Sequence, residues 1–474
     1  MRWAFAAACG LLVASAAPAA DQVSYFKEVR PLFQQHCQGC HQPAKAQGGY
    51  VMTDHAGLLK AGDGGKPGVK PGKPAESFLL DEIQVKGGKA EMPKSGAPLK
   101  PEQYALIEKW IAEGAVDDTP ASAKTKAIDA DRPPVYSSPP VITSLAFSPD
   151  DKLLAVTGYH EVLLYSADGE KLLARLVGLS ERIQAVAFSP DGKLLAVAGG
   201  DPGRFGEIQI WDVEKRKLKL SVPVTYDTVY GVSWAPDGSK VAFGCADNTV
   251  RAIDPLTGKQ VVQMGTHSDW VLGTVFSRDG QHIASVSRDM STKLTEVATE
   301  RFIDNVTSIT PGALKGGLMA IDIRPKVDKA TTKVPDDEGG KFHEKSYDEL
   351  ITAGSDGIPR LYKMHREAKR QIGDDSNKIR QYEAVVGRVS SARFNADGSK
   401  FAAVGSLDGK GEVAVYTTAA DKKAAKCEGI SGPVYTVAWK KDGTAIASGG
   451  FDGKVWLHDP ATGKLMKAFT VLPK

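Results

Sequence analysis

From Val141 to the C-terminus, apolar and polar residues alternate in pairs of short segments that are joined by a tight turn. Six stretches share this design: an alternating strand, an Asp-Gly or Asp-Asp turn, and a second apolar strand. Alternation with a period of two indicates strands, so this part of the chain is predicted to be all-β. The turn aspartates are Asp150, Asp191, Asp237, Asp279, Asp397 and Asp442.

The spacing of these aspartates predicts the architecture. Successive aspartates lie 41, 46, 42, 118 and 45 residues apart, and the long gap holds one further unit, "LMAIDIRP" followed by "ELITAGSDGIPRLYKM". Seven such units predict a seven-bladed β-propeller over residues 140–474, because one four-stranded unit cannot bury both of its faces alone. A charged insertion at about 326–348 falls within the extra unit, and we expect it to form a long exposed loop.

The pattern of apolar positions before residue 116 has a helical period instead. Tyr25, Val29 and Phe33 recur four residues apart, and "LKPEQYALIEKWIAEGA" carries an apolar face behind Pro101, which suits a first helical turn. These two helices predict a small all-α domain over residues 21–115. Residues 116–139 are rich in Pro, Ala, Ser and charge without periodicity, so they are predicted to be a linker.

Residues 1–20 are predicted to be a secretory signal. Arg2 precedes an apolar stretch from Trp3 to Ala14, and Ala17-Pro18-Ala19 offers a small-x-small cleavage site. No later apolar run reaches about 18 residues. We therefore expect an exported, soluble, periplasmic protein without a membrane span after signal cleavage. The net charge of +3 over 474 residues gives no reason to expect a nucleic-acid partner, since such binders carry a strongly basic domain.

Two cysteines, Cys37 and Cys40, are followed directly by His41 in "HCQGCH". This C-x-x-C-H spacing is typical of covalent attachment of one haem c, with the two thiols joined to the porphyrin and His41 as the proximal iron ligand. Zinc would need a second ligand pair, and none follows. A thioredoxin-like pair would sit in a βαβ context, whereas the preceding residues are helical. A plain disulfide also suits an exported protein and remains the alternative. Cys245 and Cys427 are predicted to be unpaired packing residues.

The distal side of the iron has three candidate ligands, Met52, His55 and Met92. Met92 precedes Pro93 in the loop "AEMPKSGAPL", where a methionine held by a following proline can direct its sulfur at the iron. Met52 is explained more simply as packing, and His55 as the start of a short helix. We therefore predict Met92 as the distal ligand.

The stretch from Val23 to Ala115 resembles the planctomycete-type c-type cytochrome domain through "FKEVRPLFQQHCQGCH", "GGYVMTDHAGLLKAGDGG", "PGKPAESFLL", "MPKSGAPL" and "LIEKWIAEGA". The resemblance implies haem c held by Cys37 and Cys40, and iron ligated by His41 and Met92. Members of that family often carry two prolines after the methionine, where this chain has Pro93-Lys94. The departure leaves the ligand itself intact.

The C-terminal units resemble WD40 repeats through "IQIWDV" and through recurring turn aspartates such as Asp289. The glycine-histidine start usual in that family is mostly absent, and only His267 in "GTHSDWV" comes close. The other propeller histidines are scattered, and no catalytic triad, phosphate loop or metal cluster is visible. We predict a protein-binding platform rather than an enzyme.

The complete prediction is an exported mono-haem cytochrome that transfers single electrons between protein partners, one of them held by the propeller. Two alternatives remain at this point. The propeller could carry a substrate or second-cofactor site served by the cytochrome, or the chain could be an interaction scaffold that contains haem.

Overall fold

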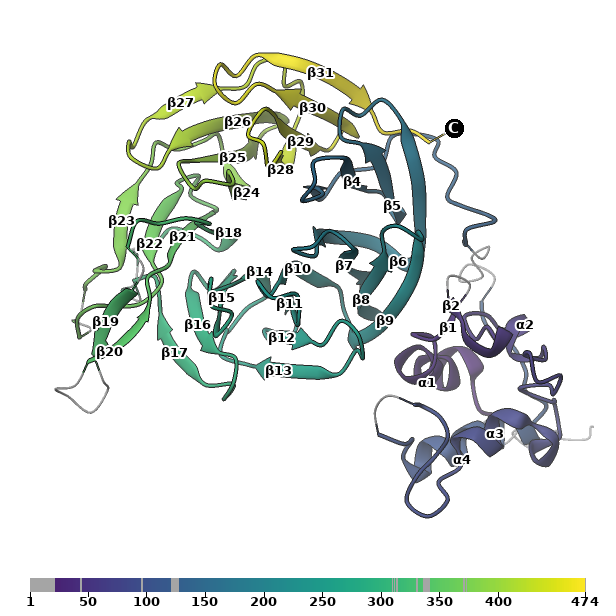
Figure 1. The fold of residues 1–474 in the computed structure, drawn as a ribbon. Coiled ribbons are helices and arrows are strands. Elements are labelled where there is room, and N and C mark those ends of the chain that lie inside the picture. The colour runs from purple at the N-terminus through teal and green to yellow at the C-terminus, as the bar shows by residue number, and fades with distance from the viewer. Residues whose placement is uncertain are drawn as a thin grey trace, which may run out of the picture.

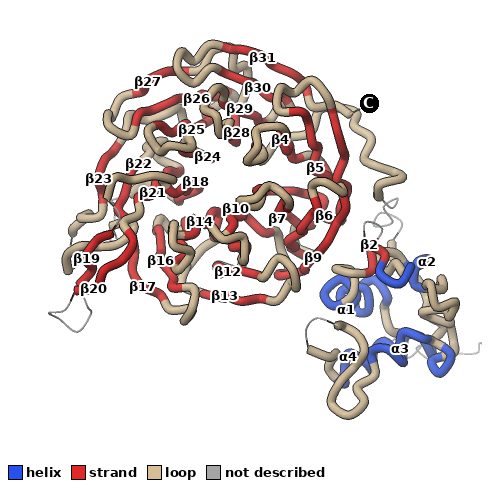
Figure 2. The backbone as a smooth tube through the Cα atoms, viewed as in Figure 1, coloured by secondary structure: helices blue, strands red, loops and turns tan. Residues whose placement is uncertain are grey.

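The computed structural model describes residues 22–42, 45–94, 97–120, 128–308, 310, 312, 314–329, 331–335, 342–369, 371 and 373–473. The predicted signal, residues 1–20, lies outside the described residues, as does 121–127 within the predicted linker. Figure 2 shows that the helices gather in a small N-terminal part, while strands make up the rest. None of the helices in the described part of the chain is long and apolar enough to cross a bilayer.

The small domain buries its core between its first and last helical segments, as the sequence predicts. Tyr25 stacks on Trp110 with ring centroids 5.3 Å apart, and Phe33 meets the same indole edge-on at 6.3 Å. Pro101 opens the last helix at its first position. The elements are a π-helical turn Tyr25–Val29, α1 (Arg30–His36), β1 (His41–Gln42), β2 (Lys45–Ala46), 3₁₀ turns Gln47–Gly49 and Pro74–Glu76, α2 (His55–Leu58), α3 (Phe78–Ile83) and α4 (Pro101–Ala112).

The described residues beyond the linker form seven four-stranded antiparallel units around a central axis (Figure 1). The long strand β6 belongs to two blades, because its first part pairs with β5 and its second part with β7. Blade 1 holds β3 (Leu145–Phe147), β4 (Leu153–Thr157), β5 (Tyr159–Ser166) and the start of β6 (Leu172–Phe188). Blade 2 adds β7 (Leu194–Asp201), β8 (Phe205–Asp212) and β9 (Lys217–Thr225) to the rest of β6.

The remaining blades follow the same order from the axis outward. Blade 3 holds β10 (Val229–Trp234), β11 (Val241–Cys245), β12 (Val250–Ile253) and β13 (Gln260–Met264). Blade 4 holds β14 (Val271–Phe276), β15 (His282–Ser287), β16 (Thr292–Glu296) and β17 (Phe302–Asn305). Blade 5 holds β18 (Leu318–Ile323), β21 (Glu349–Gly354), β22 (Arg360–Lys363) and β23 (Lys378–Gln381). Blade 6 holds β24 (Arg388–Phe394), β25 (Lys400–Leu407), β26 (Lys410–Thr417) and β27 (Lys423–Lys426). Blade 7 holds β28 (Val434–Trp439), β29 (Ile446–Gly450), β30 (Lys454–His458) and β31 (Leu465–Thr470).

The charged insertion differs from the expected loop. Its described residues pair as an antiparallel hairpin of β19 (Thr331–Pro335) and β20 (Phe342–Ser346), inserted between β18 and β21. Thr332 and Val334 lie on either side of Lys333, and this period-two pattern within a charged stretch allows a two-stranded ladder. The six turn aspartates behave as predicted, since each accepts the backbone N–H two residues further on.

Blades 1 and 7 meet without sharing a strand, because all four strands of blade 7 come from the C-terminal end. Instead, β3 packs on β28, and the Ile142 N–H donates to the Gly450 carbonyl at 2.9 Å. Asp151 adds a second link: its carboxylate accepts the N–H groups of Lys441 and Asp442 at 2.7 and 2.8 Å. Asp151 has φ +58° at a turn position where the other five turns have glycine. The strained aspartate therefore stabilises the contact between the two ends of the propeller.

Replacing Asp151 by glycine should lower the free energy of unfolding of the propeller by about 1–2 kcal/mol, because two hydrogen bonds to a charged acceptor are lost and only the αL strain is relieved. Urea unfolding measures the change. Asp408 also has positive φ, +49°, in the β25–β26 turn, and Asp408→Gly is the matched control, expected within about 0.5 kcal/mol of wild type. Equal effects of the two substitutions would contradict a linking role for Asp151.

Candidate functional site

One cavity of about 500 Å³ lies inside the small domain, and all four residues predicted from the sequence line it. Cys37, Cys40 and His41 lie on its wall after α1, and Met92 lies on the wall contributed by the loop after α3. Much of the rest is apolar or aromatic. The volume is within the range of cofactor pockets. The other lining residues are His36, Gln47, Gly48, Tyr50, Met52, Gly62, Asp63, Gly64, Lys66, Gly68, Phe78, Leu79, Glu82, Ile83, Pro93 and Lys94.

The two cysteines lie on a tight turn at the end of α1. The Cys37 N–H donates to the Phe33 carbonyl at 2.9 Å, and the N–H groups of Cys40 and His41 both donate to the Cys37 carbonyl at 3.1 Å. Both thiols are free, so the structure has no disulfide at this pair. Burial, and then the neighbouring Cys40, raises the pKa of Cys37 to about 12. The described residues hold no group of three metal-ligating side chains, so the second ligand pair of a zinc site is missing among them.

His41 is held by a carbonyl that fixes its tautomer. Its Nδ1 donates to the Tyr50 carbonyl at 3.1 Å, which leaves Nε2 as the nitrogen able to ligate a metal. Tyr50 is held in turn, because its hydroxyl donates to the Leu58 carbonyl at 2.7 Å. This support is the usual outer shell of a ligating histidine. Sequence reasoning missed Tyr50, because a backbone acceptor leaves no side-chain signal.

The three candidates for the distal iron ligand lie in different surroundings. Met92 is half-buried on the cavity wall, and its N–H donates to the Glu82 carbonyl at 2.8 Å. Met52 also lines the cavity and is almost fully buried in the core. His55 does not line it: its Nε2 donates to the Ala115 carbonyl at 2.6 Å and its ring packs edge-on against Tyr25. Met92 as distal ligand stays a prediction.

The donor set fits a covalently attached porphyrin. Two thiols, an imidazole with its tautomer fixed, and a thioether surround one largely apolar cavity. By contrast, the cavity lined by the innermost propeller strands measures about 90 Å³, and its lining includes no histidine. Of these two, the cavity of the small domain is the better candidate for a cofactor, because its lining holds the two thiols and the imidazole.

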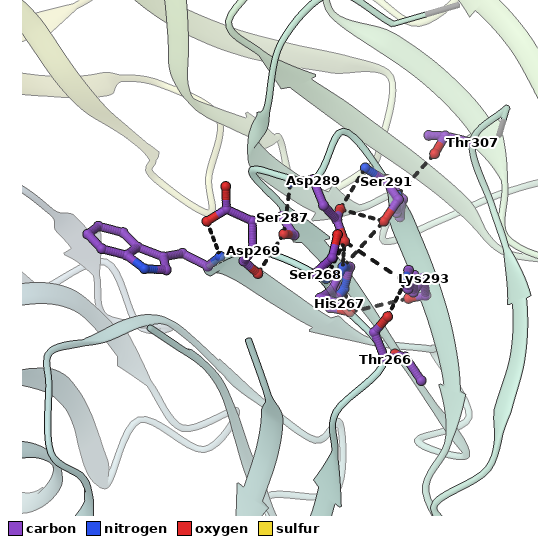
Figure 3. A network of polar contacts seen from close by, with 12 residues as sticks. Thr266, His267, Ser268, Asp269, Ser287, Asp289, Ser291, Lys293 and Thr307 are labelled. Carbon is purple, nitrogen blue, oxygen red and sulfur yellow. Dashed lines mark hydrogen bonds and ion pairs between the residues drawn. The ribbon is translucent and has the colours of Figure 1, made fainter. Parts of the chain in front are cut away.

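A second polar constellation lies in blade 4 (Figure 3). His267 Nδ1 bonds to Asp289 at 2.9 Å, and His267 Nε2 bonds to the Ser285 hydroxyl at 2.8 Å. This Asp–His–Ser order is that of a hydrolase triad, but Ser285 is fully buried within β15. Burial alone would raise the pKa of Asp289. The hydrogen bonds from His267 and Ser291 outweigh this effect, so the pKa lies well below its usual range. The network therefore stabilises the blade.

Two histidines that are far apart in the sequence meet between blades 4 and 5. The rings of His282 and His365 are perpendicular with centroids 4.8 Å apart, and both residues are buried. Burial, and then His282, lowers the pKa of His365 to about 4; burial, and then Lys345, lowers the pKa of His282. The two histidines lie 83 residues apart in the sequence, so no local pattern predicts that they meet.

This pair predicts a loss of stability in mild acid. The folded pKa of His365 lies below its unfolded value of 6.5, so stability is complete above pH 6.5 and falls as the pH drops towards 4. Between pH 7.5 and 5, we expect His365 to remove about 2 kcal/mol from the free energy of unfolding. Urea unfolding at the two pH values measures this loss of unfolding free energy, which should be smaller in His365→Gln than in wild type. His343→Gln, at an exposed site on β20, is the control and should leave the loss unchanged. An unchanged pH dependence in His365→Gln would contradict the prediction.

The fold and the cavity define a class of protein: a small helical domain with a cofactor-sized cavity, joined to a seven-bladed propeller. Comparison with known families agrees with both parts. The family described as Planctomycete cytochrome C matches residues 37–96. The WD domain, G-beta repeat, matches 218–254, 258–295 and 422–459, and the Anaphase-promoting complex subunit 4 WD40 domain matches 145–230. The chain is thus a fusion of a cytochrome-type domain with WD40 repeats.

Individual relatives match only limited stretches of the chain. WD repeat and SOCS box-containing protein 1 of Danio rerio is 37% identical over 83 residues, which is 17% of this chain and 20% of that protein. Transcription factor unc-37 of Caenorhabditis elegans is 27% identical over 176 residues, 37% of this chain and 27% of that protein. Coronin-7 of Homo sapiens is 31% identical over 58 residues, 12% of this chain and 6% of that protein. The chain therefore spans about a quarter or less of the length of these relatives.

Proposed function

We propose that this chain is an exported mono-haem c-type cytochrome that exchanges single electrons with a protein partner, and that its propeller binds a protein. The proposal assigns a signal to 1–20, the haem domain to 21–115, a linker to 116–139 and the propeller to 140–474. The observation that carries it is the convergence of Cys37, Cys40, His41 and Met92 on one cavity of about 500 Å³.

Each residue has a separate task in this proposal. Cys37 and Cys40 hold the porphyrin covalently, and the tight turn between them keeps both sulfurs on one wall. His41 ligates the iron through Nε2, held in orientation by the Tyr50 carbonyl. The apolar wall of Leu79 and Ile83 excludes water. When bound, the haem would supply reversible one-electron chemistry, and the Met92 thioether would favour a higher potential than a second histidine.

Exposed apolar side chains support the proposed role of the propeller as a protein-binding platform. In an antiparallel blade, the loop between the second and third strands lies at the same face as the loop that enters the next blade. Tyr226 (67% exposed) and Phe451 (60% exposed) lie in such loops. Exposed aromatic side chains on one face are available for contact with a protein partner. Further members of the same face are Tyr159, Trp270, Met290, Val386 and Leu407.

The distal ligand can be tested at nearly constant side-chain volume. Met92→Leu removes the thioether, so the reduced holoprotein should bind carbon monoxide and the oxidised form should lose the methionine–iron charge-transfer band. Met52→Leu is the matched control, because Met52 lines the same cavity. Optical spectra distinguish the two. Loss of the band in Met52→Leu alone would show that the wrong methionine has been assigned.

A further inference from the structure

The small domain rests against the outer strand of blade 2. Both α1 and β2 contact β9, and Figure 1 shows the domain beside this edge of the propeller. The C-x-x-C turn comes very close to β9: a Cβ added to Gly39 would come within 2.4 Å of the Ser221 carbonyl oxygen and 3.1 Å of Pro223 Cδ. Only a glycine lets the attachment turn come this close to the β9 backbone.

The second half of β9 is covered, as are residues 173–180 of β6 in blade 1 and 303–305 of β17 in blade 4. From Leu220 to Thr225 none of its residues is exposed. In the outer strands of blades 5, 6 and 7, namely β23, β27 and β31, exposed residues occur throughout. A covered edge is the expected state of a strand that has a partner, because an outer strand otherwise leaves backbone groups unpaired. Next to the contact lies a cavity of about 100 Å³, lined from one side by Pro31, Gln34 and Gln35, and from the other by Arg204, Phe205, Pro223, Val224, Thr225 and Tyr226.

The contact point on β9 is anchored from inside the blade. The Ser221 hydroxyl donates to the buried carboxylate of Glu207, which also accepts the Ser180 hydroxyl and the Gln209 amide at 2.6 Å. Gln209 accepts in turn from the Trp211 indole N–H at 2.9 Å. A strand tied down in this way offers a rigid backbone surface to the turn that carries Cys37 and Cys40.

We propose that β9, the outer strand of blade 2, is the docking site of the haem domain, called the seat below. Gly39 is the residue that allows the attachment turn to dock there. The seat places the haem domain beside Tyr226, at the border of the apolar propeller face. A protein held on that face is thereby presented to the haem domain in one orientation. This consequence rests on the proposed function, whereas the seat itself depends only on the contacts between Gly39 and β9.

Hydrogen exchange of the holoprotein, read by mass spectrometry, tests the seat. In Gly39→Ala, a peptide covering β9 should exchange at least about threefold faster than in wild type, because the added methyl group forces the domain away and opens the edge. Thr225→Arg, which alters the propeller side only, should do the same. Gly265→Ala is the control, since its added Cβ meets nothing closer than 3.8 Å, and β13 is the reference strand in every sample.

Equal exchange of β9 in wild type, Gly39→Ala and Thr225→Arg would overturn the seat. Retention of haem through acid–acetone extraction is measured on the same samples. A wild-type protein that carries no haem but still protects β9 would overturn the proposed function and leave the seat standing. Faster exchange of β9 in both variants, with haem retained, supports both.

Discussion

A Cys37→Ser, Cys40→Ser double variant should be exported without covalent haem and with a less stable small domain. The two thiols are the only groups on the described cavity wall that can form thioethers, so no other residue can replace them. The domain core packs around a cavity of about 500 Å³, so we expect its stability to depend on the group that fills that space. We expect the free energy of unfolding of the small domain to fall by about 3–4 kcal/mol, the effect of losing a ligand present at 100 to 1,000 times its Kd.

Haem content by absorbance, and thermal unfolding followed by circular dichroism, measure these two effects. Cys427→Ala is the control, because Cys427 is a buried free thiol of the propeller and lies outside the cavity. It should retain full haem and lose stability only in the propeller. Covalent haem in the double-serine variant would rule out attachment at this turn.

Replacing Asp289 by alanine should cost the propeller about 3–5 kcal/mol, the largest effect expected outside the haem domain. The substitution leaves His267, whose side chain is fully buried, without its acceptor, and it removes the acceptor of the Ser268 N–H and the Ser291 hydroxyl. The network joins the loop before β14 to the turn between β15 and β16 (Figure 3). Its loss should therefore loosen blade 4 as a unit.

Urea unfolding followed by tryptophan fluorescence measures this cost. Asp247→Ala is the matched control, because Asp247 also lies in a turn between the second and third strands of a blade but pairs with Arg251 near the surface. It should cost no more than about 1 kcal/mol. Haem content should stay unchanged in both variants. A cost for Asp289→Ala as small as that of the control would show that blade 4 is held by its apolar packing alone.

The sequence carries much of this fold because its features are local and repeated. Strand alternation and the turn aspartates recur in each unit, and the apolar faces around Tyr25 and Trp110 follow the helical period. The candidate site is equally local at its centre, since Cys37, Cys40 and His41 are close together in the chain. Met92 required an inference about a loop, and the structure places it on the same cavity.

Features formed by residues that are far apart in the sequence could not be predicted from local patterns. Asp151 meets a turn about 290 residues away, and His282 meets His365 across two blades. The departure of Asp151 from the Asp-Gly pattern was visible, but its partners were not. The need for glycine at position 39 could not be predicted either, because it arises from the nearby backbone of β9. The hairpin β19–β20 was missed because its charged composition hides a weak alternation.

The most direct measurement is the optical spectrum of the oxidised and reduced protein, made in cells with haem-attachment machinery and followed by acid–acetone extraction. The proposed function predicts one haem per chain that stays with the polypeptide, with a methionine–iron charge-transfer band in the oxidised form. A colourless protein from such cells, with Cys37 and Cys40 joined as a disulfide, would contradict it.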